Sequence, residues 1–141
     1  MTKDELKKKL RSAQTLSKLL EADITELQNM RDYAGKITPA YSLAPSGNST
    51  GQRIENDTAK IVDLENTIKS DREQLRKAIE EVKQLIGLVD DPLLSRILYK
   101  RYLQYKKWEQ IAVDLNYTYR RVLQLHGIGL NEIMKRFHIV S

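Results

Sequence analysis

Two runs of apolar residues in heptad spacing constrain the fold of this chain more than any other feature. The first run extends from residue 3 to about residue 34, and the second from residue 54 to residue 89. Apolar residues at alternating spacings of three and four form a stripe along a helix that must pack against another helix. The runs consist of Leu6, Leu10, Ala13, Leu20, Ile24, Leu27 and Ala34, then Ile54, Ile61, Leu64, Ile68, Leu75, Ala78, Val82, Leu85 and Val89. The pattern predicts two long helices that pack on each other, with Asp57 and Asp71 as polar breaks in the second.

Residues 35–51, GKITPAYSLAPSGNSTG, separate the two runs and contain two prolines and three glycines. Proline removes a backbone donor and glycine lowers helix propensity, so we expect both helices to stop outside this segment. Two amphipathic helices joined in this way are typical of an antiparallel hairpin. The loop is longer than a minimal helical connection, so its tip is expected to be either disordered or a contact surface.

A second change of composition occurs at IGLVDDPLLSRI. Asp90 or Asp91 can cap a helix and Pro92 suits its first turn. A new periodic face follows, made of Leu93, Leu94, Ile97, Leu98, Arg101 and Tyr102. We therefore place a domain boundary between residues 89 and 90, with a helical hairpin for oligomerisation or protein contact before it. No stretch alternates with the period of a strand, so the predicted fold is all-α: a long antiparallel coiled-coil hairpin and then a helix-turn-helix module over residues 90–141.

The tightest predicted turn lies in VDLNYT. A helix that starts near Trp108 places Ala112 on its apolar side, where a small residue lets two backbones approach. Asn116 then has to leave the helix, and asparagine tolerates the positive φ that such a turn requires. Thr118 can cap the next helix, whose apolar face is Val122, Leu125 and Gly129. The pattern is that of a helix-turn-helix.

Charge is unevenly distributed along the chain. The net charge is +5, of which residues 90–141 hold +4, with nine Lys/Arg against five Asp/Glu. A basic excess of this kind attracts phosphate. Arg120 and Arg121 follow the predicted cap, and arginine can bind guanine O6 and N7 bidentately. Gln124 is on the same helix face as Arg120 and could pair with adenine, while Lys106 and Lys107 would meet the DNA backbone.

The run RYLQYKKWEQIAVDLNYTYRRVLQLH resembles region 4 of bacterial sigma factors. With the helical part before it, the chain is similar to the ArpU and RinA type of phage and prophage transcriptional regulators. The resemblance implies that Tyr119, Arg120 and Gln124 face bases and phosphates in the major groove, and that RNA polymerase is a possible partner. Leu123 stands where sigma factors often have arginine, which implies a different readout. The predicted DNA-binding set is Thr118, Tyr119, Arg120, Arg121, Gln124, Lys106 and Lys107.

Several residues have a structural interpretation instead. Tyrosines among leucines are usually half-buried core residues, so we expect Tyr99, Tyr102 and Tyr117 to belong to the core and Trp108 to pack, with Tyr119 as the exception. The two histidines, His126 and His138, have no carboxylate at metal-ligand spacing, so we expect neither a metal site nor a cofactor. The bases of KKKLR in the first helix are balanced by nearby acids and are as consistent with a solvated face as with a binding site.

The sequence also disfavours other classes of protein. Cysteine is absent, and there is neither a Gly-rich phosphate loop nor a histidine beside a plausible nucleophile, so we expect no enzyme activity. Without a signal peptide or an apolar run long enough to span a bilayer, the expected localisation is cytoplasmic. The preferred hypothesis is a sequence-specific regulator of phage genes that binds double-stranded DNA as a homo-oligomer, with a dimer favoured. The alternatives are a phage small terminase subunit, which packages DNA, and a coiled-coil adaptor that does not bind DNA.

Overall fold

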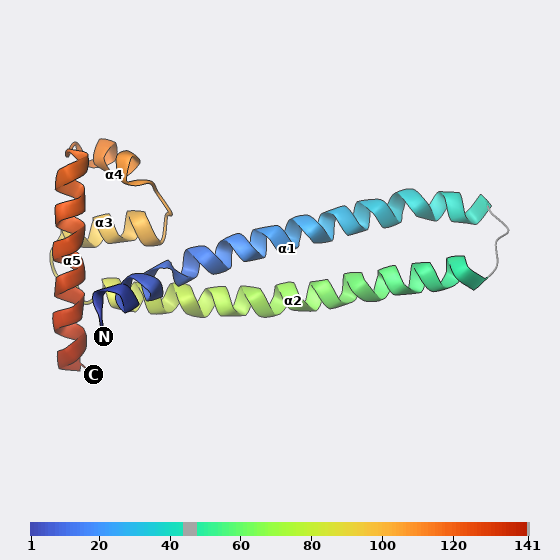
Figure 1. The fold of residues 1–141 in the computed structure, drawn as a ribbon, viewed down its shortest axis with the longest axis horizontal. Coiled ribbons are helices and arrows are strands. Elements are labelled where there is room, and N and C mark those ends of the chain that lie inside the picture. The colour runs from blue at the N-terminus through green and yellow to red at the C-terminus, as the bar shows by residue number, and fades with distance from the viewer. Residues whose placement is uncertain (44–47, 141) are drawn as a thin grey trace. The chain divides into compact units, whose positions relative to one another are not determined.

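The protein is composed of helices throughout the part of the chain that the structure describes. In the computed structural model, the backbone is described for residues 1–43 and 48–140, and side chains for residues 1–35 and 55–138. The helices are α1 (Lys3–Leu43), α2 (Asn48–Ile86), α3 (Pro92–Tyr102), α4 (Trp108–Leu115) and α5 (Tyr119–Val140) (Figure 1). No strand occurs among the described residues. The predicted all-α class with a long pair of N-terminal helices is therefore confirmed.

The first turn of α1 is held by a capping box that the heptad pattern does not reveal. The Thr2 amide donates to Glu5 Oε2 at 3.0 Å, and the Glu5 amide donates to Thr2 Oγ1 at 3.2 Å. These reciprocal bonds satisfy two backbone donors that a helix start otherwise leaves free. The helix consequently begins firmly at Lys3, the first residue of α1.

The connection between α1 and α2 is shorter than the sequence predicts. The first helix continues through Gly35 to Leu43, and the second begins at Asn48, so the expected loop over residues 35–51 is wrong in its bounds. One proline costs about 3 kcal/mol inside a helix, but each further residue of an established helix adds a hydrogen bond without a new nucleation step. A prediction from residue propensities alone therefore places the end of such a helix too early in the chain. Residues 44–47, with the predicted tip, lie outside the described residues.

The chain divides into two compact units, and the division does not follow the predicted boundary at residues 89 and 90. One unit, here called the composite unit, contains residues 1–16 and 75–141, and the other, the hairpin unit, contains residues 17–74. The difference arises because the ends of α1 and α2 share a core with the C-terminal helices. That core includes Leu6, Leu10, Ala78, Val82, Ile86, Leu94, Ile97, Leu98, Ile111, Val122, Leu130 and Ile133.

The hairpin unit is an antiparallel pair made by the remaining parts of α1 and α2. Arg31 on α1 forms an ion pair of 2.6 Å with Glu65 on α2. Its seam is narrow, because among the described apolar residues of this unit only Leu20, Leu27 and Ile68 are buried. Leu19 on α1 and Val62 on α2 are exposed instead.

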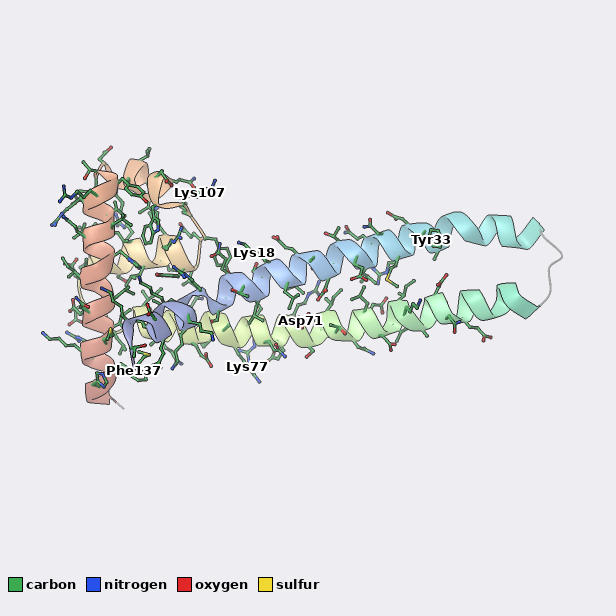
Figure 2. The ribbon with its side chains drawn as sticks, in the orientation of Figure 1. Lys18, Tyr33, Asp71, Lys77, Lys107 and Phe137 are labelled. Carbon is green, nitrogen blue, oxygen red and sulfur yellow. The ribbon has the colours of Figure 1, made fainter. Side chains whose placement is uncertain are left out.

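Asp23 and Asp71 face each other within the seam of the hairpin unit. Figure 2 shows Asp71 on the side of α2 that is turned toward α1. The pKa of Asp71 is raised, first by a hydrogen bond with the Asp23 side chain and then by burial and the negative charge of Asp23. The Asp71 Oδ2 atom is buried without a hydrogen-bond partner among the described groups. The predicted polar break at Asp71 is thus a carboxyl group that keeps its proton to a higher pH than an isolated aspartate does.

Two glycines in α5 occupy different environments, although helix propensity predicts the same cost for both. A Cβ at Gly129 would lie 3.3 Å from Leu98 Cδ1 and 3.8 Å from Leu94 Cβ, and both leucines are buried. A Cβ at Gly127 would meet only Lys3 Nζ, at 4.0 Å. Gly129 therefore permits the close approach of α3 and α5, whereas Gly127 has no packing requirement.

These environments predict opposite signs for the two alanine variants. Gly127→Ala should raise the free energy of unfolding by about 0.5 to 1 kcal/mol, because alanine restricts the unfolded chain and suits a helix better. Gly129→Ala should gain the same propensity but lose more through overpacking against Leu98, for a net loss of about 1 kcal/mol. Urea unfolding followed by circular dichroism measures both, and equal stabilisation by the two variants would contradict the close packing at Gly129.

Candidate nucleic-acid interface

The corner between α4 and α5 consists of Asn116, Tyr117 and Thr118, and it has the local geometry that the sequence predicts. Asn116 has φ 57° and ψ 37°, which is the left-handed conformation. The Tyr117 amide donates to the Ala112 carbonyl at 3.0 Å, and this bond closes the end of α4. Ala112 is buried beside the crossing helix. The predicted role of Asn116 as the residue that leaves α4 is confirmed.

Thr118 restarts the helix directly after the corner. Its Oγ1 accepts a hydrogen bond from the Arg121 amide at 3.1 Å, and its carbonyl accepts one from the Val122 amide at 3.1 Å. A threonine cap of this type satisfies one of the free donors at the first turn of a helix. Since Val122 is completely buried, the cap and the core together determine which side of α5 faces outward.

The outward side of α5 carries polar and basic residues from its first turn. Arg120, Gln124, Asn131 and Lys135 are all exposed and recur at helical spacing. The first acidic residue of α5 is Glu132, so its first three turns contain no negative charge. Tyr119 is also exposed, as predicted, with 46% of its surface accessible. The structure thus brings together five of the predicted site residues: Thr118, Tyr119, Arg120, Arg121 and Gln124.

Arg120 and Arg121 have different surroundings although they are adjacent. The Arg121 guanidinium donates to Gln124 Oε1 at 3.4 Å. Neither arginine forms an ion pair with an acidic group of the described residues. Both charges are therefore available to an anionic partner, and Arg120 lies on the same ridge of α5 as Gln124.

Lys106 and Lys107 lie at the opposite end of α4 from the corner. Lys106 Nζ is 2.7 Å from Asp114 Oδ2, and Lys100 Nζ is 3.5 Å from the same oxygen. The hydrogen bond from Lys106 lowers the pKa of Asp114, and the bond to Asp114 raises the pKa of Lys106. Lys107 is exposed on the connection before α4 (Figure 2). No contact among the described residues joins either lysine to the α5 group, and Lys106 already has an acidic partner.

Two of the tyrosines that we expected in the core are exposed. Tyr99 and Tyr117 keep 44% and 41% of their surface accessible, so this expectation is wrong for them, while Tyr102 is buried as predicted. Tyr117 lies in the corner, outside both helices, where periodicity does not determine the direction of a side chain. Tyr99 follows the buried Leu98 and therefore points away from the side of α3 that packs.

Exposed apolar residues surround the corner. Val113 has 76% of its surface accessible and Leu123 has 37%. With Tyr117 and Tyr119 they place apolar and aromatic groups beside the basic residues of α5. Apolar side chains of this kind can contact the thymine methyl group in a major groove. An interface with both kinds of group is able to contact base edges as well as phosphates.

A buried cluster behind the interface joins α3, α4 and α5. Tyr102 Oη and His126 Nε2 are 2.6 Å apart, and the Trp108 ring packs edge-on against the His126 ring with centroids at 4.5 Å. Arg101 lies over the Trp108 ring at 4.4 Å and donates to the Lys106 carbonyl at 3.0 Å. The expected packing of Trp108 is confirmed. Periodicity could identify the buried positions, but it could not show that they meet.

His126 is neutral in this environment at physiological pH. Its pKa is lowered from 6.5 to about 4, chiefly by burial and further by the positive charges of Lys7, Arg101, Lys3 and Arg11. Burial also raises the pKa of Tyr102, against the smaller opposing effects of Arg11 and Arg101. Within the described residues, no group of three or more His, Cys, Asp or Glu side chains could hold a metal ion.

Comparisons with known proteins do not assign this chain to a family. No family model, curated protein or solved structure matches this chain. None of the helices in the described part of the chain is long and apolar enough to cross a membrane.

Proposed function

We propose that this protein is a sequence-specific DNA-binding regulator of transcription that inserts the N-terminal turns of α5 into the major groove. The observation that carries the proposal is the exposed start of α5, where Arg120 and Gln124 share one ridge and no acidic residue occurs before Glu132. The major groove admits an α-helix, and recognition helices contact base edges with their N-terminal residues. The resemblance to sigma region 4 supports the same orientation.

The corner supports the proposal by making the first turns of α5 rigid. The left-handed Asn116, the Thr118 cap and the buried Val122 each constrain the start of the helix. A side chain that discriminates between bases has to be positioned accurately before binding, because ordering it on contact costs free energy. Arg120 and Gln124 are therefore presented by a preorganised helix, and Lys107 is available for a phosphate farther along the DNA.

We also propose that the protein acts as a dimer. A single recognition helix contacts only a few base pairs, and dimers gain specificity by binding two half-sites separated by about one helical turn. The hairpin unit supports this proposal because its buried seam is narrow and leaves Leu19 and Val62 exposed. The proposal also includes regulation of phage genes and contact with RNA polymerase, and these two points rest only on the resemblance to sigma region 4 and to phage regulators.

Selection of bound sequences from random duplexes tests the function directly. We expect an enriched motif of two short half-sites in inverted or direct repeat, together with a dimeric mass by light scattering. If the protein retains all duplex sequences equally well, the proposal of sequence-specific recognition is wrong. A ring of about eight or more chains would instead indicate an assembly typical of DNA-packaging subunits.

A further inference from the structure

Three basic residues form a line along the first turns of α1. Lys3, Lys7 and Arg11 are spaced four residues apart, which places them on one side of the helix. Lys3 and Arg11 are exposed and Lys7 is half-buried. From Lys3 to Arg11 the line covers eight residue steps, or about 12 Å of helix. We refer to Lys3, Lys7 and Arg11 as the α1 ridge.

Lys3, the first member of the α1 ridge, lies close to α5 within the composite unit. Lys3 Nζ is 4.0 Å from the point where a Cβ at Gly127 would be. Gly127 is three residues after Gln124 on α5. Because Gly127 has no side chain, the Lys3 ammonium group approaches the helix that carries Arg120 and Gln124. The sequence gives no indication of this contact, since the two residues are more than a hundred positions apart.

The other two members of the ridge also face the C-terminal helices. Lys7 and Arg11, like Lys3, lower the pKa of the buried His126 on α5 through their positive charge. Arg11 has the same effect on the pKa of Tyr102 on α3. All three charges are therefore near His126 on α5, and that of Arg11 is also near Tyr102 on α3.

The ridge has no acidic partner within the described part of the chain. Lys106 pairs with Asp114, and Arg136 pairs with Asp90, but neither Lys3, Lys7 nor Arg11 forms an ion pair there. Like charges that are held close together repel one another, and a bound polyanion relieves that repulsion. The ridge thus has the electrostatic properties of an anion-binding surface, beside a helix whose own first turns carry no acid.

We propose that the α1 ridge binds phosphates of the same DNA duplex that receives α5 in its major groove. This inference rests on the proposed function. Each DNA strand carries one phosphate per 3.4 Å of helix axis, so phosphates lie within reach of three cations spread along about 12 Å. Backbone contacts of this kind fix the register of a recognition helix without reading the sequence.

The capping box of α1 supports this role. The reciprocal bonds between Thr2 and Glu5, at 3.0 and 3.2 Å, hold the first turn in which Lys3 lies. A lysine on a frayed terminus would have to be ordered when DNA binds, at a cost in entropy. Here the helix start is already ordered, so the ridge keeps its spacing before the duplex arrives.

The salt dependence of binding tests the inference. The variant Lys3→Gln/Lys7→Gln/Arg11→Gln and the control Lys8→Gln/Lys60→Gln/Lys77→Gln each remove three charges, and the control residues are all exposed. Fluorescence anisotropy with a selected and a scrambled duplex measures affinity over a range of KCl concentrations. We expect the ridge variant to reduce the slope of log K against log [salt] by about 2.7, at about 0.9 per phosphate contact. Affinity should fall alike on both duplexes, while the control keeps the wild-type slope.

The outcomes separate the ridge from the proposed function. A ridge variant that keeps the wild-type slope while wild type binds DNA specifically would overturn the ridge alone. Wild-type protein that binds no duplex would overturn both proposals. If the triple variant loses its helical circular dichroism, the double variant Lys3→Gln/Arg11→Gln changes only exposed residues, and its slope should fall by about 1.8.

Discussion

Arg120→Ala should weaken binding to the selected duplex by roughly tenfold to a hundredfold and relax the base preference at one position of each half-site. The expected loss is about 1 to 3 kcal/mol, which is the discrimination that one bidentate arginine contributes. Arg120 is exposed, lies at the first turn after the Thr118 cap and has no acidic partner among the described residues. Its removal therefore deletes a contact without disturbing the core.

Arg121→Ala provides the matched control for this prediction. Arg121 is adjacent to Arg120 and carries the same charge, but it does not lie on the line of α5 that Arg120 and Gln124 share. Its guanidinium donates a hydrogen bond to Gln124 Oε1 at 3.4 Å. We expect Arg121→Ala to weaken binding to all duplexes similarly and to lower the salt slope by about 0.9, as for one phosphate contact. Competition binding with single-base variants of the selected site distinguishes the two effects. Equal changes in base preference for both alanine variants would show that Arg120 does not read a base.

The composite unit should lose about 3 kcal/mol of stability as the pH falls from 6.5 to 4, because His126 must take up a proton on unfolding. Its pKa is about 4 in the folded protein against 6.5 as the ordinary value, and one pKa unit corresponds to about 1.4 kcal/mol. Between these values the unfolded chain binds more protons than the folded chain, so stability decreases with decreasing pH. Above pH 6.5 the contribution of neutral His126 to the unfolding free energy is fully present, and below pH 4 it is absent.

His126→Gln isolates this contribution. Glutamine keeps polar groups for Tyr102 Oη, which is 2.6 Å from His126 Nε2 in the wild type, but it does not titrate. The difference in unfolding free energy between wild type and the variant should change by about 3 kcal/mol over the window and be constant outside it. A flat difference between pH 6.5 and 4 would mean that His126 is not protected from protonation.

A difference measurement is needed because the hairpin unit has a contribution of opposite sign. The pKa of Asp71 is raised by its hydrogen bond with Asp23. The folded chain therefore binds a proton that the unfolded chain releases, and stability rises as the pH falls through the raised pKa. This contribution is present in both wild type and His126→Gln and cancels in their difference.

Local features were predictable where neighbouring residues determine them. Asn116 adopts positive φ and Thr118 caps α5 because each acts on backbone groups within a few positions of itself. The same holds for Asp91, whose carboxylate accepts from the Leu93 amide at 2.8 Å at the start of α3. The heptad runs indicated α1 and α2 because periodicity reports which side of a helix is apolar.

Features that depend on several elements were not predictable in this way. Tyr102, Trp108 and His126 are on three different helices, and only the packing of these helices brings their rings together. The pairing of Lys106 with Asp114 removed one candidate phosphate contact, and the approach of Lys3 to Gly127 added another. Such effects depend on distances through space, which spacing along the chain does not report.

The sequence by itself determined the all-α class, the long helical pair and the sharp corner at Asn116, because hydrophobic periodicity and capping act over one or two helical turns. Tertiary structure alone decided that the ends of α1 and α2 join the C-terminal helices in one core. It also decided which charges remain free and that His126 stays neutral among cations. Burial and electrostatic interaction arise from groups that are near in space, so these properties exist only once the helices have packed.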